Sequence, residues 1–216
     1  FTTHTELLEV EDLVRGMHFT SQLSRAAGLP LPRDAKMTDV PCHSWIMPTL
    51  LRGAGVDFLH IGCNAASRSP EVPMLFWWEG PDGARLLTMY AAEGYGSGLL
   101  PPANWPYETW LALIHTGDNA GPPPPDQVEK LLREAEQKLP GVPVRIGRLS
   151  DFCDAILAEK AAGLRIFTAP KLFSGGDEQS FQCQVRCFQG MAEVVGKDVF
   201  LAHRGRVEQP GVAEIC

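Results

Sequence analysis

A carboxylate and a histidine separated by a short turn make residues 36–45, KMTDVPCHSW, the first place in this sequence to expect chemistry. Asp39 follows a short extended segment, and the ends of parallel strands are where α/β folds place their sites. The Pro-containing turn allows Asp39 and His43 to face one cavity. Alternatively, Asp39 caps the following helix and His43 packs beside it.

Two adjacent tryptophans mark a second segment, FWWEGPDG, at residues 76–83. On a strand, Trp77 and Trp78 point to opposite faces, so one of them belongs to the core while the other is available for stacking. An aromatic face suits a sugar ring as well as it suits a core. Core packing of both rings is the alternative.

Two shorter segments offer further polar groups. The loop HTGDNAGP at residues 115–122 has the residue types of a turn, and it either forms only that turn or presents Asp118 to a cleft. At the N-terminal end, His4 and Glu6 gather where a helix is expected to begin. Capping of that helix by Thr5 is the simpler reading.

The first half of the chain predicts alternating helices and strands. Apolar spacing favours helices over residues 5–27 and 44–53, and strands over residues 35–38 and 56–61. Residues 74–90 favour two strands joined by a tight Pro-Asp-Gly turn.

The second half continues this alternation. We expect a short helix at 107–114, a well-marked amphipathic helix at 126–139, a strand at 142–146, and a helix that Ser150 caps and that ends near residue 160. Such alternation predicts an α/β fold with a mostly parallel sheet. Beyond residue 164 the periodicity is lost and residues 165–216 are left unassigned.

Composition narrows the function classes. The 216 residues are 44% hydrophobic and 21% charged, with a net charge of −7 and no basic run, which argues against a nucleic-acid partner. No apolar stretch is long enough to span a bilayer, and no signal peptide is visible; the compartment stays open, with the cytoplasm favoured. The six cysteines are thinly spread and a domain of this size needs no disulfides, so most of them are predicted to be free thiols. Cys183, Cys187 and His203 lack a fourth zinc ligand, so no zinc site is expected there.

Taken in order, these segments resemble glycoside hydrolase family 38. TDVPCHS at residues 38–44 is similar to that family's Asp-Pro-x-Gly-His-Ser segment, and FWWEGPDGARLLTMY to its Trp-x-Gly-x-Asp-Gly hairpin. GDNAGP at residues 117–122 is similar to its Gly-Asp-Gly-Gly-Gly-Pro loop. Together with FTTHTELL, these runs resemble a little-characterised branch of family-38-like hydrolases. The resemblance spans about residues 1–160.

The resemblance implies part of a seven-stranded β/α barrel, with parallel strands and a β-hairpin insertion, over residues 1–164. It implies a retaining, zinc-dependent hydrolase of α-mannoside-like substrates. Asp39 would then be the nucleophile and a zinc ligand, and Asp118 the acid/base. Carbohydrate would be contacted by Glu6, His43, Trp77 and Trp78.

The departures from the family matter equally. The family's first-strand His-x-Asp zinc pair and its later zinc-binding His have no counterpart here, and Cys42 stands where the family has Gly. A catalytic zinc needs three protein ligands, so we expect zinc only in a complete domain and this chain to be a fragment. The alternatives are an inactive carbohydrate-binding remnant and a zinc-dependent polysaccharide deacetylase. A deacetylase would require a His-x3-His pair, which this sequence lacks. A structural α/β domain with coincidental motifs is the remaining reading.

Overall fold

A computed structural model describes residues 3–40, 43–64, 69–70, 72–114, 120–159 and 166–168. The chain divides into two compact units, one formed by residues 1–95 and 162–216 and the other by residues 96–161. Residues 169–216 lie outside the described part, so the predicted boundary at residue 164 stays a prediction. Within the described residues, no helix is long and apolar enough to cross a membrane.

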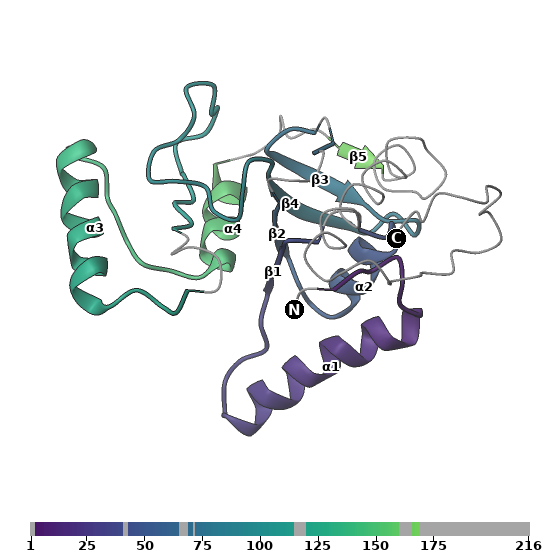
Figure 1. Cartoon of the computed structure of the whole chain (residues 1–216). Coiled ribbons are helices and arrows are strands. Elements are labelled where there is room, and N and C mark those ends of the chain that lie inside the picture. The colour runs from purple at the N-terminus through teal and green to yellow at the C-terminus, as the bar shows by residue number, and fades with distance from the viewer. Residues whose placement is uncertain are drawn as a thin grey trace, which may run out of the picture. The chain divides into compact units, whose positions relative to one another are not determined.

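The first unit is an open mixed sheet with two helices (Figure 1). Its elements are α1 (Val10–Ala26), β1 (Asp34–Thr38), α2 (Met47–Gly53), β2 (Phe58–Gly62), β3 (Leu75–Glu79), β4 (Arg85–Ala91) and β5 (Ile166–Thr168). The strand order is β1-β2-β4-β3-β5. The predicted α/β class is confirmed, whereas the strands that the structure describes do not close into a barrel.

The three strands β1, β2 and β4 run parallel and in register. Thr38 lies opposite Gly62, and Gly62 opposite Ala91, so the carboxyl ends of all three strands meet at one edge of the sheet. β3 and β4 form the predicted antiparallel hairpin, with Gly83 in the turn at φ 81°. A positive φ is available to Gly at little steric cost, which explains the Pro-Asp-Gly sequence.

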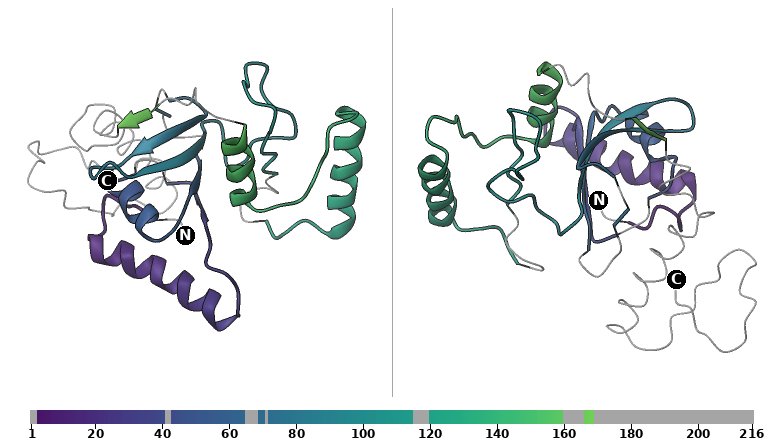
Figure 2. Two further views of the ribbon diagram at one scale, coloured as in Figure 1. Left: turned by 180° about the vertical axis from the view of Figure 1, so that it is seen from behind. Right: turned by 90° about the horizontal axis from the view of Figure 1, so that it is seen from above.

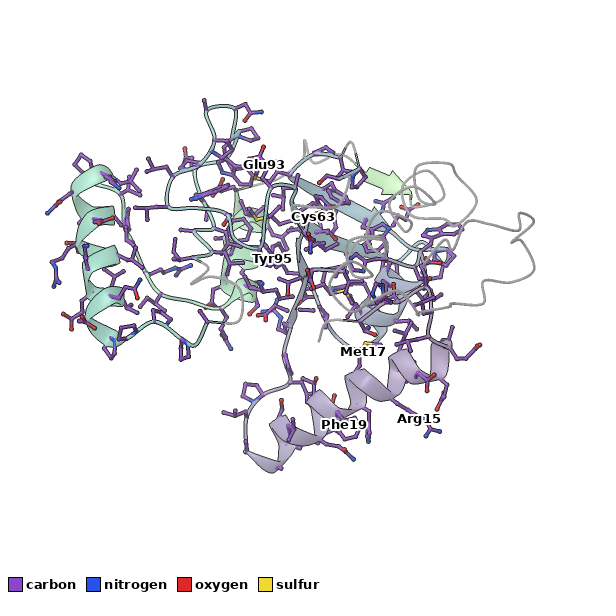
Figure 3. All side chains as sticks on the ribbon, viewed as in Figure 1. Arg15, Met17, Phe19, Cys63, Glu93 and Tyr95 are labelled. Carbon is purple, nitrogen blue, oxygen red and sulfur yellow. The ribbon has the colours of Figure 1, made fainter. Side chains whose placement is uncertain are left out.

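The apolar core lies between one face of this sheet and the two helices. Figure 2 shows α1 and α2 on the same side of the sheet, and Figure 3 shows Met17 on the side of α1 that faces it, with Arg15 pointing away. The core cluster includes Leu13 of α1, Met47 of α2 and Trp78 of β3. Trp78 is fully buried, so the core reading holds for this ring.

Helix α1 begins later than predicted. The sequence favours a start at residue 5, but the helix begins at Val10 because Thr5 is buried and bonds elsewhere: the backbone N–H of Ser44 donates to Thr5 Oγ1 at 2.7 Å. The predicted end is correct, since Gly28 follows the helix at φ 65°.

The second unit contains α3 (Pro125–Lys138) and α4 (Leu149–Ala158). Both helices are close to their predicted ranges, although Arg148 rather than Ser150 occupies the cap position of α4. The Asp151 carboxylate accepts a hydrogen bond from the Arg148 backbone N–H at 2.8 Å. Ser150 is instead buried.

Two predicted elements of this unit are wrong. Residues 142–146 form no strand, and Val142, Val144 and Ile146 are exposed; apolar sequence makes a strand only where a neighbouring strand pairs with it. Residues 107–114 form no helix. There the Glu159 carboxylate accepts the backbone N–H groups of Glu108 and Thr109, and these longer-range bonds replace helical ones.

Candidate functional site

Asp39 has an uncommon backbone conformation. It directly follows β1, its backbone N–H donates to Gly62 O at 3.1 Å, and its φ is 75°. Among the residues that the structure describes, it is the one non-glycine residue with positive φ. Such a conformation costs on the order of 1–3 kcal/mol and recurs where a site requires it, and aspartate is among the residues that tolerate it best.

Two distant side chains fix the orientation of the Asp39 carboxylate. Asn64 Nδ2 donates to Asp39 Oδ1 at 2.6 Å, and the Tyr95 hydroxyl donates to the same oxygen at 2.5 Å. The side chain of Asp39 is exposed, and its second oxygen, Oδ2, accepts no hydrogen bond from the described residues. One oxygen is therefore held in place, while the other has no hydrogen-bond donor among the described residues.

Sheet topology brings these donors to Asp39. Asn64 comes two residues after β2, and Tyr95 lies in the segment that follows β4. Because β1, β2 and β4 are parallel neighbours, the segments that follow them emerge at the same edge. Figure 3 shows Tyr95 at that end of the sheet, beside Cys63.

Gly62 allows the approach of the Tyr95 segment. A Cβ added at Gly62 would lie 2.7 Å from Tyr95 Cα and 3.1 Å from the carbonyl oxygen of Gly94. Any larger residue would force this backbone away from the end of β2. The glycine is therefore a requirement for placing the Tyr95 hydroxyl on Asp39.

His4 interacts electrostatically with Asp39, and His43 interacts with His4. Burial lowers the pKa of His4, and the negative charge of Asp39 partly opposes that effect. His43 is fully buried, and burial, with a smaller contribution from His4, lowers its pKa to about 4. At neutral pH the His43 ring is therefore uncharged, and its full burial keeps it from direct contact with solvent.

Of the other predicted site residues, Trp77 and Trp78 are not brought to Asp39. Glu6 is exposed in the turn before α1. Trp77 is aligned across the sheet with Asp34, at the opposite end of β1 from Asp39, and Trp78 lies one residue further away. At about 3.3 Å per residue, five residues separate these positions by roughly 16 Å along the strands. Asp118 lies outside the described residues.

Sequence reasoning missed Asn64, Gly62 and Tyr95. The available signal was their position, because each lies at or just after a run that the sequence predicts to be a strand. Polar residues that follow neighbouring parallel strands are brought to one edge. The strand order that makes β1, β2 and β4 neighbours was not visible in the sequence.

The zinc expectation finds no support in the donors at this site. In the part of the chain that the structure describes, no group of three or more His, Cys, Asp or Glu side chains could hold a metal ion. The side chains that contact Asp39 are an amide and a phenol, which do not complete a catalytic zinc site. The described donors alone therefore do not fit a catalytic zinc ion.

Comparison with known proteins found no family model that matches this chain and no curated protein that matches it.

Proposed function

We propose that this chain is part of a retaining glycoside hydrolase that acts on α-mannoside-like substrates, with Asp39 as its nucleophile. The observation that carries the proposal is the asymmetric Asp39 carboxylate, in which Oδ1 accepts two hydrogen bonds and Oδ2 accepts none from the residues that the structure describes. A nucleophilic carboxylate requires this arrangement, because one oxygen must attack while the group keeps a fixed orientation. The resemblance of residues 38–44 to the family-38 nucleophile segment supplies the substrate class.

The chemical role of Asp39 follows from its two oxygens. Oδ2 attacks the anomeric carbon, the bond from that carbon to the leaving oxygen breaks, and a glycosyl ester of Asp39 forms. Water then hydrolyses the ester with a second inversion, so the anomeric configuration is retained. Tyr95 and Asn64 hold Oδ1 throughout and keep the carboxylate aligned.

A second carboxyl group must protonate the leaving oxygen from about 5 Å away. Asp118 is the candidate that the resemblance supplies, and it belongs to this proposal on that ground alone. Glu6 and Trp77 remain candidates for sugar contact in the same sense, whereas Trp78 is fully buried in the core and contacts no sugar. Their positions give that role no independent support.

The barrel is likewise part of the proposal. Three parallel strands with helices α1 and α2 packed on one face, and a candidate nucleophile at the carboxyl edge, agree with a portion of a β/α barrel. The β3–β4 hairpin corresponds to the expected insertion. Zinc is part of this proposal only for a complete domain that supplies further ligands.

A carbohydrate-binding remnant without catalysis is the second candidate. It is favoured by the lack of a three-ligand metal group among the described side chains. In that case Asp39 accepts hydrogen bonds from sugar hydroxyls and forms no ester.

Covalent trapping separates these two functions. The chain is incubated, with and without added zinc, with an activated fluorinated α-mannosyl fluoride, whose glycosyl ester hydrolyses slowly. It is then digested and mapped by mass spectrometry. We expect one glycosyl group on the peptide that contains Asp39, and none in Asp39→Asn. Sugar binding without any label would favour the remnant, and a label on another carboxylate would refute the role of Asp39.

A further inference from the structure

The chain passes from the first unit into the second between Tyr95, which holds Asp39, and Gly96. On one side of this junction, Tyr95 is fixed to the first unit by its hydroxyl bond to Asp39 Oδ1 and by the close approach of its Cα to Gly62. On the other side, Ser97 is hydrogen-bonded within the second unit. Gly96 alone separates the two attachments.

Ser97 makes its hydrogen bonds with both its side chain and its backbone. The hydroxyl donates to the carbonyl oxygen of Leu111 and accepts the backbone N–H of Leu113 at 2.8 Å, and the Ser97 backbone N–H donates to Leu113 O at 3.0 Å. Next to it, the Trp110 indole N–H donates to Gly98 O at 3.3 Å. These hydrogen bonds fix the first residues of the second unit.

The stretch that holds Ser97 is itself anchored. Trp110 packs edge-to-face on Trp105, with ring centroids 4.9 Å apart, and the Trp105 indole N–H donates to Thr109 O at 2.9 Å. The Glu159 carboxylate, just after α4, accepts the backbone N–H of Thr109 at 2.9 Å. A series of contacts therefore runs from the end of α4 to Ser97.

The contact between Tyr95 and Asp39 depends on how the Tyr95 backbone is held. A hydrogen bond to an exposed carboxylate is readily exchanged for one to water, because its net contribution is small. Gly94 and Gly96 flank Tyr95, and glycine restrains the backbone less than any other residue. The restraint on the second-unit side of Tyr95 therefore comes from the hydrogen bonds of Ser97.

We propose that Ser97 is a positioning residue that acts through Tyr95 on Asp39, and that it makes the alignment of the carboxylate depend on the structure of the second unit. As a statement about catalysis, this inference rests on the proposed function, because alignment affects the rate only if Asp39 attacks the substrate. The coupling of Ser97 to the hydrogen bond between Tyr95 and Asp39 does not depend on that function.

Fluorine NMR measures this coupling without any substrate. The chain has three tyrosines, Tyr90 in the core, Tyr95 and Tyr107, so labelling with 3-fluorotyrosine gives three resonances, and substitution of each tyrosine by Phe assigns them. Asp39→Gly removes the carboxylate and tolerates positive φ, so it shows the Tyr95 resonance of the released hydroxyl. We expect Ser97→Ala to shift the Tyr95 resonance at least halfway to that position and to leave Tyr90 unchanged.

The matched variants test whether the hydroxyl of Ser97 is responsible. Ser97→Thr keeps a hydroxyl and is expected to leave the Tyr95 resonance in place. Ser21→Ala removes a hydroxyl that bonds within α1 and is expected to change no resonance. If circular dichroism shows that Ser97→Ala does not fold, Trp110→Phe takes its place, because it loses the N–H donor to Gly98 O and keeps an aromatic ring. An unchanged Tyr95 resonance in the folded variant overturns the inference.

Kinetics separates this inference from the proposed function. For an aryl α-mannoside, with and without added zinc, we expect Ser97→Ala to lower kcat up to about tenfold at unchanged KM, and Ser97→Thr to retain kcat. The double variant Ser97→Ala/Tyr95→Phe is expected to lose no more than Tyr95→Phe alone. Losses that multiply in the double variant overturn the action through Tyr95. If the wild-type chain cleaves no α-mannoside, the proposed function fails for this chain, and the NMR result alone decides the coupling.

Discussion

Asp39 and Asp82 both follow a strand, but they lie at opposite ends of the strands and their carboxylates accept hydrogen bonds from different kinds of donor. At the hairpin edge, Asp82 Oδ1 accepts the Thr49 hydroxyl at 2.6 Å and the Ala84 backbone N–H at 3.0 Å. These hydrogen bonds, that from Thr49 foremost, lower the pKa of Asp82. They brace the turn and tie it to α2.

At the other edge, the donors to Asp39 come from far along the chain. Asn64 and Tyr95 are 25 and 56 residues away from it in sequence, and both bond to one oxygen. Asp82 has one donor from its own turn and one from α2, 33 residues away, and these bonds hold the turn in place. Both donors to Asp39 are side chains of segments that follow other strands, so they fix the carboxylate itself rather than a turn, which agrees with the role proposed for it.

The largest expected effect on kcat/KM is that of replacing Asp39, and the same replacement at Asp82 is its control. Asp39→Asn is expected to lower kcat/KM for an aryl α-mannoside about 10³-fold, because an amide is a poor nucleophile. Asparagine also tolerates positive φ, so the backbone is kept. Asp82→Asn retains an acceptor oxygen and is expected to leave kcat/KM unchanged. Equal losses in both variants would remove the distinction between the two edges.

Acid is expected to destabilise the protein through the buried histidines. The pKa values of His43 and His60 are about 4 in the folded chain, below the unfolded value of 6.5. As the pH falls below 6.5 the unfolded chain takes up these protons first, so each histidine lowers the free energy of unfolding by up to about 1.4 kcal/mol per pH unit until about pH 4. Urea unfolding at pH 7, 6 and 5 measures this slope.

His60→Gln is the variant that checks this assignment. It removes one of the two histidines whose pKa is lowered to about 4, while His43 and the partly buried His4 remain, so the slope of stability against pH is expected to fall by up to about 1.4 kcal/mol per pH unit between pH 6.5 and 5. The carboxylates with lowered pKa, Asp57, Asp82 and Asp151, take up protons below this range. Constant wild-type stability from pH 7 to pH 5 would contradict the burial of neutral histidines.

Gly62→Ala tests the route by which Tyr95 reaches Asp39. The new Cβ would overlap Tyr95 Cα, so the segment must shift, and we expect a loss of about 1–3 kcal/mol in urea unfolding together with reduced activity. Gly53→Ala, in helix α2 with open space around it, is the matched control and is expected to be neutral or up to about 1 kcal/mol stabilising. Full activity in Gly62→Ala would show that the Tyr95 contact is dispensable.

The smallest expected effects come from removing one hydroxyl group at each of the two edges. Tyr95→Phe removes the donor to Asp39 Oδ1 and is expected to lower kcat/KM about tenfold, with less than about 1 kcal/mol change in stability because Asp39 is exposed. Thr49→Val removes the donor to Asp82 and is expected to lower stability by about 1 kcal/mol with unchanged kcat/KM. The reverse pattern would exchange the roles assigned to the two edges.

Local sequence predicts several elements well. The Pro-Asp-Gly turn with apolar flanks predicts the β3–β4 hairpin, and the amphipathic run at 126–139 predicts α3 within a residue at each end. In each case the decisive interactions join residues close in sequence.

The failures share the opposite cause. Residues 142–146 have the apolar pattern of a strand but no pairing strand in the described part of the chain, and residues 107–114 exchange helical bonds for bonds to Ser97 and Glu159. Thr5 caps no helix because it accepts a hydrogen bond from Ser44, 39 residues away. Local propensity is overridden wherever a distant group offers the backbone a better partner.

The sequence by itself determined the α/β class, the hairpin and the choice of Asp39 as a candidate site residue. Strand periodicity, turn chemistry and residue type can all be read from short stretches of sequence. Only the tertiary structure decided that Asn64 and Tyr95 hold one oxygen of Asp39, that Trp77 and Trp78 lie toward the far end of the strands, and that His60 is buried without a partner in the described residues. The physical reason is strand order and register. These place side chains beside one another only after the parallel strands have paired.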